Sequence, residues 1–176
     1  ILGLSSSQVA GDNLSGFRKA GVLIGVFANK PLSELINLQM EMTYIQKGSN
    51  NPNMNNYEHN DVERQDISSS YIEIPLLLQY NQSNNIQIET GILAGYLIDG
   101  YYNDSQGRIP KYNESNPFIS YDFGALIGFN YKYSKKISLN TRISNSILPI
   151  GTEDKRKFLK KGKYNTVLSF TLNYTI

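Results

Sequence analysis

The last nine residues constrain the fold of this chain more than any other stretch. Residues 168–176 alternate strictly, so that Ser, Thr and Asn side chains share one face of an extended strand and apolar side chains share the other: Leu168, Phe170, Leu172, Tyr174 and Ile176. About nine residues are also what a tilted strand needs to cross the hydrocarbon core of a bilayer. The stretch therefore predicts a membrane-spanning strand, placed where it must pair with the first strand to close a barrel.

Similar alternation recurs along the chain and predicts eight strands in all, at residues 1–9, 20–29, 38–48, 71–80, 86–98, 119–133, 137–144 and 168–176. The first is the weakest, because Leu2 and Leu4 are its only alternating apolar pair. We expect a processed or truncated N-terminus, with the upstream half of this strand and an export signal missing, and an insecure seam between the first and last strands. Pro75 predicts a local bulge, since proline cannot donate to a ladder.

The connections between these strands alternate in length. Long polar loops are predicted at residues 10–19, 49–69, 99–117 and 148–163, and short turns at 31–34, 81–85 and 134–136. Transmembrane barrels have this asymmetry, with short periplasmic turns and longer extracellular loops. We therefore predict an all-β protein, a single domain over residues 1–176 that forms an eight-stranded antiparallel up-and-down transmembrane β-barrel. It would lie in the bacterial outer membrane with both termini periplasmic.

Alternation by itself does not separate a membrane barrel from a soluble lipocalin-like barrel, whose apolar face points inward. The polar faces here consist mainly of Gly, Ser, Thr, Asn and Gln, and only 18% of residues are charged. Small and amide side chains suit a crowded lumen better than a water-facing wall. On a lipid face Arg142 would cost about 2–4 kcal/mol near the bilayer midplane. We therefore predict a structural charge network in the lumen. In it Arg142 pairs with the three glutamates Glu41, Glu73 and Glu89, and the other members are Asp122 and Lys132.

Tyrosines are predicted to form girdles at the two membrane interfaces, where amphipathic rings gather. One group falls near the strand ends at the short turns and the other near the opposite ends: Tyr80, Tyr131, Tyr133 and Tyr174, and Tyr44, Tyr96 and Tyr121. Tyrosine is also simply a good strand former, so the pattern has a structural explanation as well.

Several short runs together resemble a known family. They are Ala20-Gly21, Gly25-Val-Phe, Pro31-Leu-Ser, residues 38–48, Tyr71-Ile-Glu-Ile-Pro-Leu-Leu-Leu78, residues 89–97 and Asp122-Phe-Gly124. The chain is similar to the PorT-type outer-membrane β-barrel proteins of the Bacteroidota, small barrels like OmpA and OmpX. The resemblance implies an eight-stranded outer-membrane barrel and makes Pro75 a family feature. It implies little about activity, although the founding member is associated with the type IX secretion system. Ile176 replaces the terminal Phe common among such barrels.

Catalytic interpretations of the same residues are weaker than structural ones. Paired lumen carboxylates suit acid–base catalysis, but an eight-stranded barrel is just wide enough to be filled by its own side chains. His59 is the only histidine and we interpret it as a solvated loop residue, without the paired spacing of a metal site. We expect no enzyme activity, no cofactor, and no nucleic acid as partner, because the net charge is only +2. A lipid-modifying enzyme with a rim site and a narrow channel remain alternatives to an accessory subunit of a larger complex.

The last long loop is strongly basic and the second is acidic. Residues 148–163 hold two acidic side chains and six basic ones: Lys155, Arg156, Lys157, Lys160, Lys161 and Lys163. Residues 49–69 hold four acidic side chains and one arginine. These charges could be solvated, could pair with one another across the barrel mouth, or could contact lipopolysaccharide phosphates and other outer-membrane proteins or lipoproteins.

Overall fold

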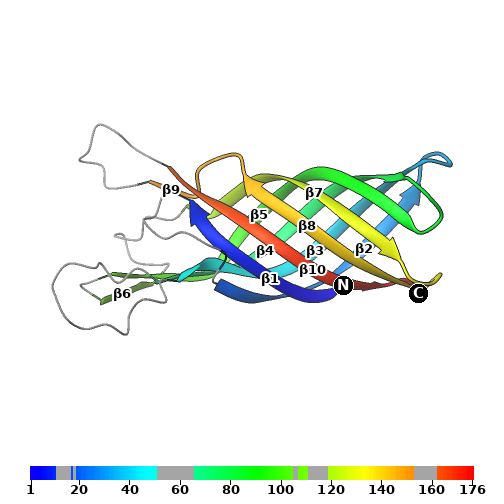
Figure 1. The fold of residues 1–176 in the computed structure, drawn as a ribbon. Helices are drawn as coiled ribbons and strands as arrows, with labels where there is room; N and C mark the ends of the chain where they lie inside the picture. The colour runs from blue at the N-terminus through cyan, green and yellow to red at the C-terminus, as the bar shows by residue number, and fades with distance from the viewer. Residues whose placement is uncertain (11–16, 18, 51–65, 105–106, 111–118, 153–161) are drawn as a thin grey trace.

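Eight strands wind into a closed barrel in the computed structural model, which describes residues 1–10, 17, 19–50, 66–104, 107–110, 119–152 and 162–176. Each strand pairs antiparallel with the next, and the first pairs with the last (Figure 1). The eight are β1 (Leu2–Ala10), β2 (Lys19–Pro31), β3 (Ile36–Asn50), β4 (Asp66–Asn81), β5 (Ile86–Asp104), β7 (Tyr121–Lys132), β8 (Ile137–Ser146) and β10 (Gly162–Tyr174). The predicted fold class, an eight-stranded antiparallel barrel, is confirmed.

Two short strands extend the barrel at the end opposite the C-terminus (Figure 1). They are β6 (Gly107–Pro110), which pairs with β5, and β9 (Gly151–Thr152), which pairs with β10. Among the residues that the structure describes, no helix is long and apolar enough to span a membrane.

Strands β3, β4 and β5 run further toward this end than predicted. Asn50 of β3 is partnered by Asp66 of β4, and Asp66 by Asn103 of β5, so parts of the predicted loops 49–69 and 99–117 are strand. Backbone pairing does not require apolar alternation, which fades here because these residues lie beyond the apolar wall. The alternation therefore marked the apolar band rather than the full length of each strand.

The predicted bulge at Pro75 is wrong. Pro75 is partnered by Leu93 in the regular β4–β5 ladder, and the register shift lies between Ser70 and Tyr71. On its other side, the β3–β4 partners pass from Met40 and Leu76 to Thr43 and Glu73 without a change of register. The ladder is thus interrupted opposite Pro75 but not displaced, as expected when a single donor is missing.

The seam between β1 and β10 is continuous, in contrast to the insecure seam that we expected. Nine consecutive residues pair, from Leu2 with Leu172 to Ala10 with Tyr164. Inside the barrel, Ser5 Oγ donates to Gln46 O at 2.7 Å and Ser7 Oγ accepts from Gly48 N at 2.8 Å, so β1 is also bonded to β3. The apolar pattern of β1 is poor because its outward face continues from Leu2 and Leu4 to the polar residues Ser6 and Gln8, whereas the pairing depends on backbone groups and on these inward serines.

The three short turns share one arrangement. In each, a serine N–H donates to the carbonyl of an isoleucine three residues on, and the isoleucine N–H donates back to the serine Oγ. The pairs are Ser33 and Ile36, Ser83 and Ile86, and Ser134 and Ile137. Such local side-chain bonds satisfy backbone groups that a tight turn leaves unpaired. The repeated Ser-x-x-Ile spacing therefore fixes where β3, β5 and β8 begin.

The faces of the strands are as the alternation predicts. Along β10, Phe170, Leu172 and Tyr174 are exposed on the outer wall, whereas Ser169 and Thr171 are buried in the lumen. Exposed tyrosines lie on the outer wall, and Tyr96 and Tyr121 pack edge to face with ring centroids 5.5 Å apart.

The lumen also holds three small apolar clusters: Leu23, Ile45, Tyr71, Leu97 and Val167; Val9, Ile67 and Ile150; and Leu77, Leu93 and Leu126.

Candidate functional site

An ion-pair cluster lies in the lumen around Arg142 of β8. Its guanidinium makes two parallel hydrogen bonds of 2.7 Å to Glu41 of β3 and a third, through Nε, to Glu89 of β5. Side-chain amides add further hydrogen bonds to both carboxylates. Gln39 donates to Glu41 at 2.6 Å, and Asn140 donates to Glu89 at 2.8 Å. Both glutamates are almost fully buried. Alternation brings these side chains inward, because each lies on the polar face of its strand.

A second cluster lies further from the short turns, around Lys47 of β3. Its ammonium pairs with Glu73 of β4 and, at 3.0 Å, with Asp122 of β7. Asp122 also accepts from Ser146 at 2.7 Å and Asn165 at 2.9 Å, and the ammonium lies 5.0 Å from the Tyr71 ring centroid. Buried charges are tolerated only when paired and hydrogen-bonded in this way.

The two clusters divide the predicted network in a way that the sequence did not show. Arg142 pairs with Glu41 and Glu89 but not with Glu73, which pairs with Lys47 instead. Lys47 was not predicted as a member of the lumen network, because the predicted strand ends beside it, at residue 48. Its even-numbered spacing from Glu41 on β3 places both on the inward face and would have identified it. Six residues separate them, roughly 20 Å along the strand.

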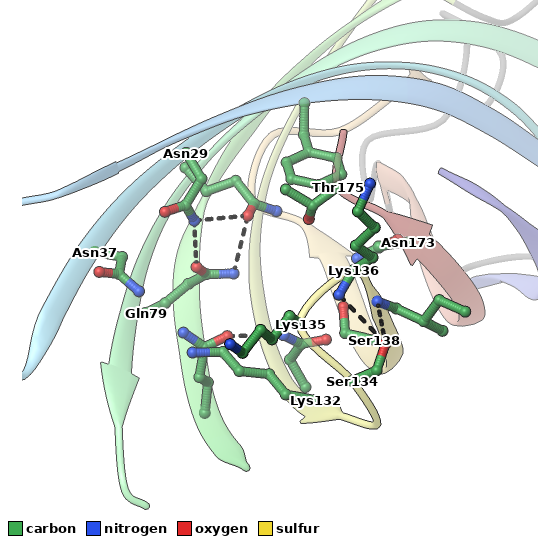
Figure 2. A pocket seen from close by; sticks show the side chains of 15 residues that line it. Asn29, Asn37, Gln79, Lys132, Ser134, Lys135, Lys136, Ser138, Asn173 and Thr175 are labelled. Atoms are coloured by element: carbon green, nitrogen blue, oxygen red, sulfur yellow. Dashed lines mark hydrogen bonds between the residues drawn. The ribbon is translucent and has the colours of Figure 1, made fainter. Parts of the chain in front are cut away.

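Lys132 also differs from the prediction, because it belongs to neither cluster. It lies at the end of β7 beside a cavity of about 250 Å³ at the short-turn end of the barrel (Figure 2). Its Nζ is 3.5 Å from Asn81 Oδ1. The cavity is lined mainly by amide side chains and by residues of the turn between β7 and β8: Phe27, Asn29, Asn37, Gln39, Gln79, Gln87, Asn130, Lys132, Ser134, Lys135, Lys136, Ile137, Ser138, Asn173 and Thr175.

Most residues of the predicted basic surface lie outside the described residues, as does His59. Lys163 is described, and its placement differs from the prediction: only 5% of the residue is exposed, so it offers little surface to a partner. Lys163 points inward like Asn165 and Ser169, because the three residues are separated by even numbers of positions along β10. Within the described ranges, no group of three or more His, Cys, Asp or Glu side chains could hold a metal ion.

Comparison with protein families gives one match that covers most of the chain. Residues 2–150 match a family model described as an outer membrane protein beta-barrel domain. Among curated proteins, none matches this chain in sequence.

Solved structures of small bacterial barrels resemble the fold. Ail, the attachment invasion locus protein of Yersinia pestis, has a TM-score of 0.59 at 8% identity, covering 98% of this chain and 93% of Ail. Ail in complex with the heparin analogue sucrose octasulfate gives 0.58 at 10% identity, covering 98% and 94%. Neisserial surface protein A gives 0.62 at 12% identity, covering 99% and 94%. At these identities the likeness concerns the fold.

Proposed function

Because this chain belongs to the outer membrane protein beta-barrel domain family, we propose that it acts as a non-enzymatic structural or accessory subunit of a larger outer-membrane complex. Protein export, assembly of outer-membrane proteins and nutrient uptake are the processes in which such a subunit would serve. The resemblance to PorT-type proteins of the Bacteroidota supports this class of role.

One observation carries the proposal: the middle of the lumen is filled by paired charges. Arg142 reaches from β8 to Glu41 on β3, and these strands are four positions apart in the eight-stranded order, on opposite sides of the barrel. A barrel of this size has no room for substrate beside such a pair. This arrangement supports a role for the outer surfaces over a role as a narrow channel.

The proposed orientation places the short turns in the periplasm and the long connections outside the cell. The contrast between the Ser-x-x-Ile turns and the extended β3–β4–β5 end supports it. In this orientation the basic side chains of the last long connection would face lipopolysaccharide phosphates or an extracellular partner: Lys155, Arg156, Lys157, Lys160 and Lys161. That Ail, a protein of similar fold, was crystallised in complex with the heparin analogue sucrose octasulfate supports contact with a polyanion.

The proposal is tested by extracting the tagged protein in a gentle detergent and identifying the proteins that co-purify with it. We expect stoichiometric outer-membrane partners, and a protein that elutes alone would contradict the subunit role. Charge reversal at Lys160 and Lys161 should weaken a salt-sensitive contact. The matched control is the same reversal at Lys135 and Lys136, in a short turn, which should leave an extracellular contact unchanged.

A further inference from the structure

The register partners around the barrel form a spiral that rises toward the end opposite the short turns, called the long-connection end below. From β1 to β7 the successive outward partners are Leu2, Ile24, Tyr44, Ile72, Tyr96 and Tyr121. In the other direction, through β10 and β8, Leu2 leads to Tyr131, which lies ten residues nearer the short turn than Tyr121 on the same strand. Ten residues of a strand tilted by about 40° span roughly 25 Å along the barrel axis, so each of the eight steps rises by roughly 3 Å.

The apolar outer wall reaches further toward the long-connection end on β5 and β7 than on β3 and β4. Two residues beyond the spiral, the outward side chains are polar on β3 and β4, where they are Gln46 and Ser70. On β5 the corresponding residue is Ile98, just before the exposed Asp99, and next to β7 it is Ile119; both isoleucines are exposed. Because β7 lies three steps from β3, the apolar Ile119 is roughly 9 Å further along the axis than the polar Gln46.

Among the described residues, this apolar extension lies on one side of the barrel. Beside it, the exposed Ile147 donates its N–H to Phe123 O at 2.7 Å, so the residue after β8 adds to the same surface. Further round the ring the outward side chains are polar again, since Thr166 of β10 donates to Asn145 of β8 at 2.6 Å and Ser6 points outward on β1. The edge of the apolar wall therefore lies furthest from the short turns around β7.

The opposite edge of the wall, at the short turns, is displaced in the matching sense. The β2–β3 turn exposes Leu32 and Leu35, whereas the β7–β8 turn exposes Lys135 and Lys136. These two turns lie across the barrel from each other, because β2 and β7 are four positions apart in the eight-stranded order. Glu34 lies between the leucines, so their turn suits the boundary between headgroups and acyl chains. The wall is thus shifted toward the long connections around β7 and toward the short turns around β2.

We infer that the apolar wall is an oblique band and that the barrel axis is inclined to the membrane normal. Lipid acyl chains cover Ile98 and Ile119 near the long-connection end and reach Leu32 and Leu35 across the barrel. The ends of β3 and β4 are then raised clear of the hydrocarbon. The β7–β8 turn, with its lysines, extends out of the membrane on its own side.

Lipid accounts for both displaced edges, whereas a protein partner accounts for one. Ile98 and Ile119 continue the wall that includes Tyr96 and Tyr121, and the apolar wall of an outer-membrane barrel faces acyl chains. A protein docked on the isoleucines would explain their exposure but not the exposed leucines of the opposite turn. A band of constant height, inclined to the axis, explains both. The inference does not depend on the proposed subunit role, because an outer-membrane barrel contacts lipid whatever its partners.

Single-cysteine variants test the inclination, since the chain contains no cysteine. Each variant carries a nitroxide spin label and is studied in phospholipid vesicles, where oxygen concentrates in the hydrocarbon and a water-soluble nickel chelate does not. We expect the label of Ile119→Cys to lie nearer the bilayer midplane than the label of Gln46→Cys. In an upright barrel the order is reversed, with the label at Ile119 roughly 9 Å further from the midplane.

A second pair of variants tests the edge at the short turns. The label of Leu35→Cys should lie in lipid, and the label of Lys135→Cys, in the turn across the barrel, should lie in water. Leu172→Cys, in the middle of the wall, is the control and should be exposed to lipid in either orientation. The inclination is refuted if the label at Gln46 lies as deep as the label at Ile119, or if the labels at Leu35 and Lys135 are equally accessible to the chelate.

The same measurement covers a protein as the occupant of the upper edge. A label at Ile119 that is exposed to water in vesicles of the purified chain would overturn the inference and leave that surface to a protein partner. The shift in gel mobility on heating verifies that each variant is folded. Ile98→Cys replaces Ile119→Cys, and Leu32→Cys replaces Leu35→Cys, if either variant fails to fold.

Discussion

Arg142 and Glu41 face each other across the full width of the barrel, joined by two hydrogen bonds of 2.7 Å although 101 residues separate them in the chain. The guanidinium also contacts Glu89, so that three strands, β3, β5 and β8, are tied together through the lumen. Bidentate pairs of this kind are the strongest and most directional of charged hydrogen bonds. The pair thus links strands on opposite sides of the lumen, in addition to the backbone ladders and side-chain hydrogen bonds between neighbouring strands.

Arg142→Met should destabilise the barrel by about 3–5 kcal/mol, because it leaves two buried carboxylates without their cation. The measurement is urea unfolding in micelles, together with the shift in gel mobility on heating. Adding Glu41→Gln and Glu89→Gln should restore much of the loss, since no unpaired charge then remains. Lys30→Met, at an exposed position on β2, serves as control and should change the unfolding free energy by less than about 0.5 kcal/mol. Unchanged unfolding of the Arg142 variant would refute the structural role.

The two ion-pair clusters should behave independently. Lys47→Met removes the partner of Glu73 and Asp122 and should also be strongly destabilising. Combined with Arg142→Met, its effect should add within about 0.5 kcal/mol, because the clusters share no partner. A double-mutant cycle between Arg142 and Glu41 should instead give a coupling of about 0.5–3 kcal/mol. Strong coupling between Lys47 and Arg142 would show that the lumen charges form one network.

Gly128 makes room for the Arg142 cluster. A Cβ added there would lie 2.7 Å from both Arg142 Cγ and Glu89 Oε1, so Gly128→Ala should displace the ion pair and cost about 1–3 kcal/mol. Gly95→Ala is the matched control, because its nearest neighbours would be 3.4 Å away in ordinary contact. Thermal unfolding of both variants is the measurement. If the Gly128 and Gly95 variants are equally stable, the side chains around Gly128 adjust to the added methyl group without cost, which would contradict the prediction.

The seam between β1 and β10 can be tested by cross-linking, since the chain contains no cysteine. Ser5 and Ser169 are register partners, and partners in an antiparallel pair have Cα atoms about 4.5–5.5 Å apart, within disulfide range. Cysteines at both positions should cross-link on oxidation and change the mobility of the heated protein on a non-reducing gel. Cysteines at Ser5 and Asn173 should not, because four residues along the strand add roughly 13 Å. Cross-linking of the second pair in place of the first would indicate a different register.

The sequence was sufficient to predict the number of strands and which of their faces points outward. Both follow from alternation within single strands, and residues such as Phe170 and Leu172 show it without reference to any other segment. The sequence was also sufficient to predict that short and long connections alternate along the chain. It did not predict the full lengths of β3, β4 and β5, because their outer parts are held by backbone pairing that leaves no apolar pattern.

The partners of the lumen charges were decided by the tertiary structure. Alternation placed Glu41, Glu73 and Arg142 inside, but which cation meets which carboxylate depends on how far each strand is staggered against those across the lumen. Because of that stagger, Glu73 pairs with Lys47, and Lys132 lies beside the cavity at the short-turn end of the barrel. The apolar wall is a property of each strand taken alone and could be predicted from sequence. The ion pairs and the cavity arise only when strands far apart in the chain are closed into a ring at one register.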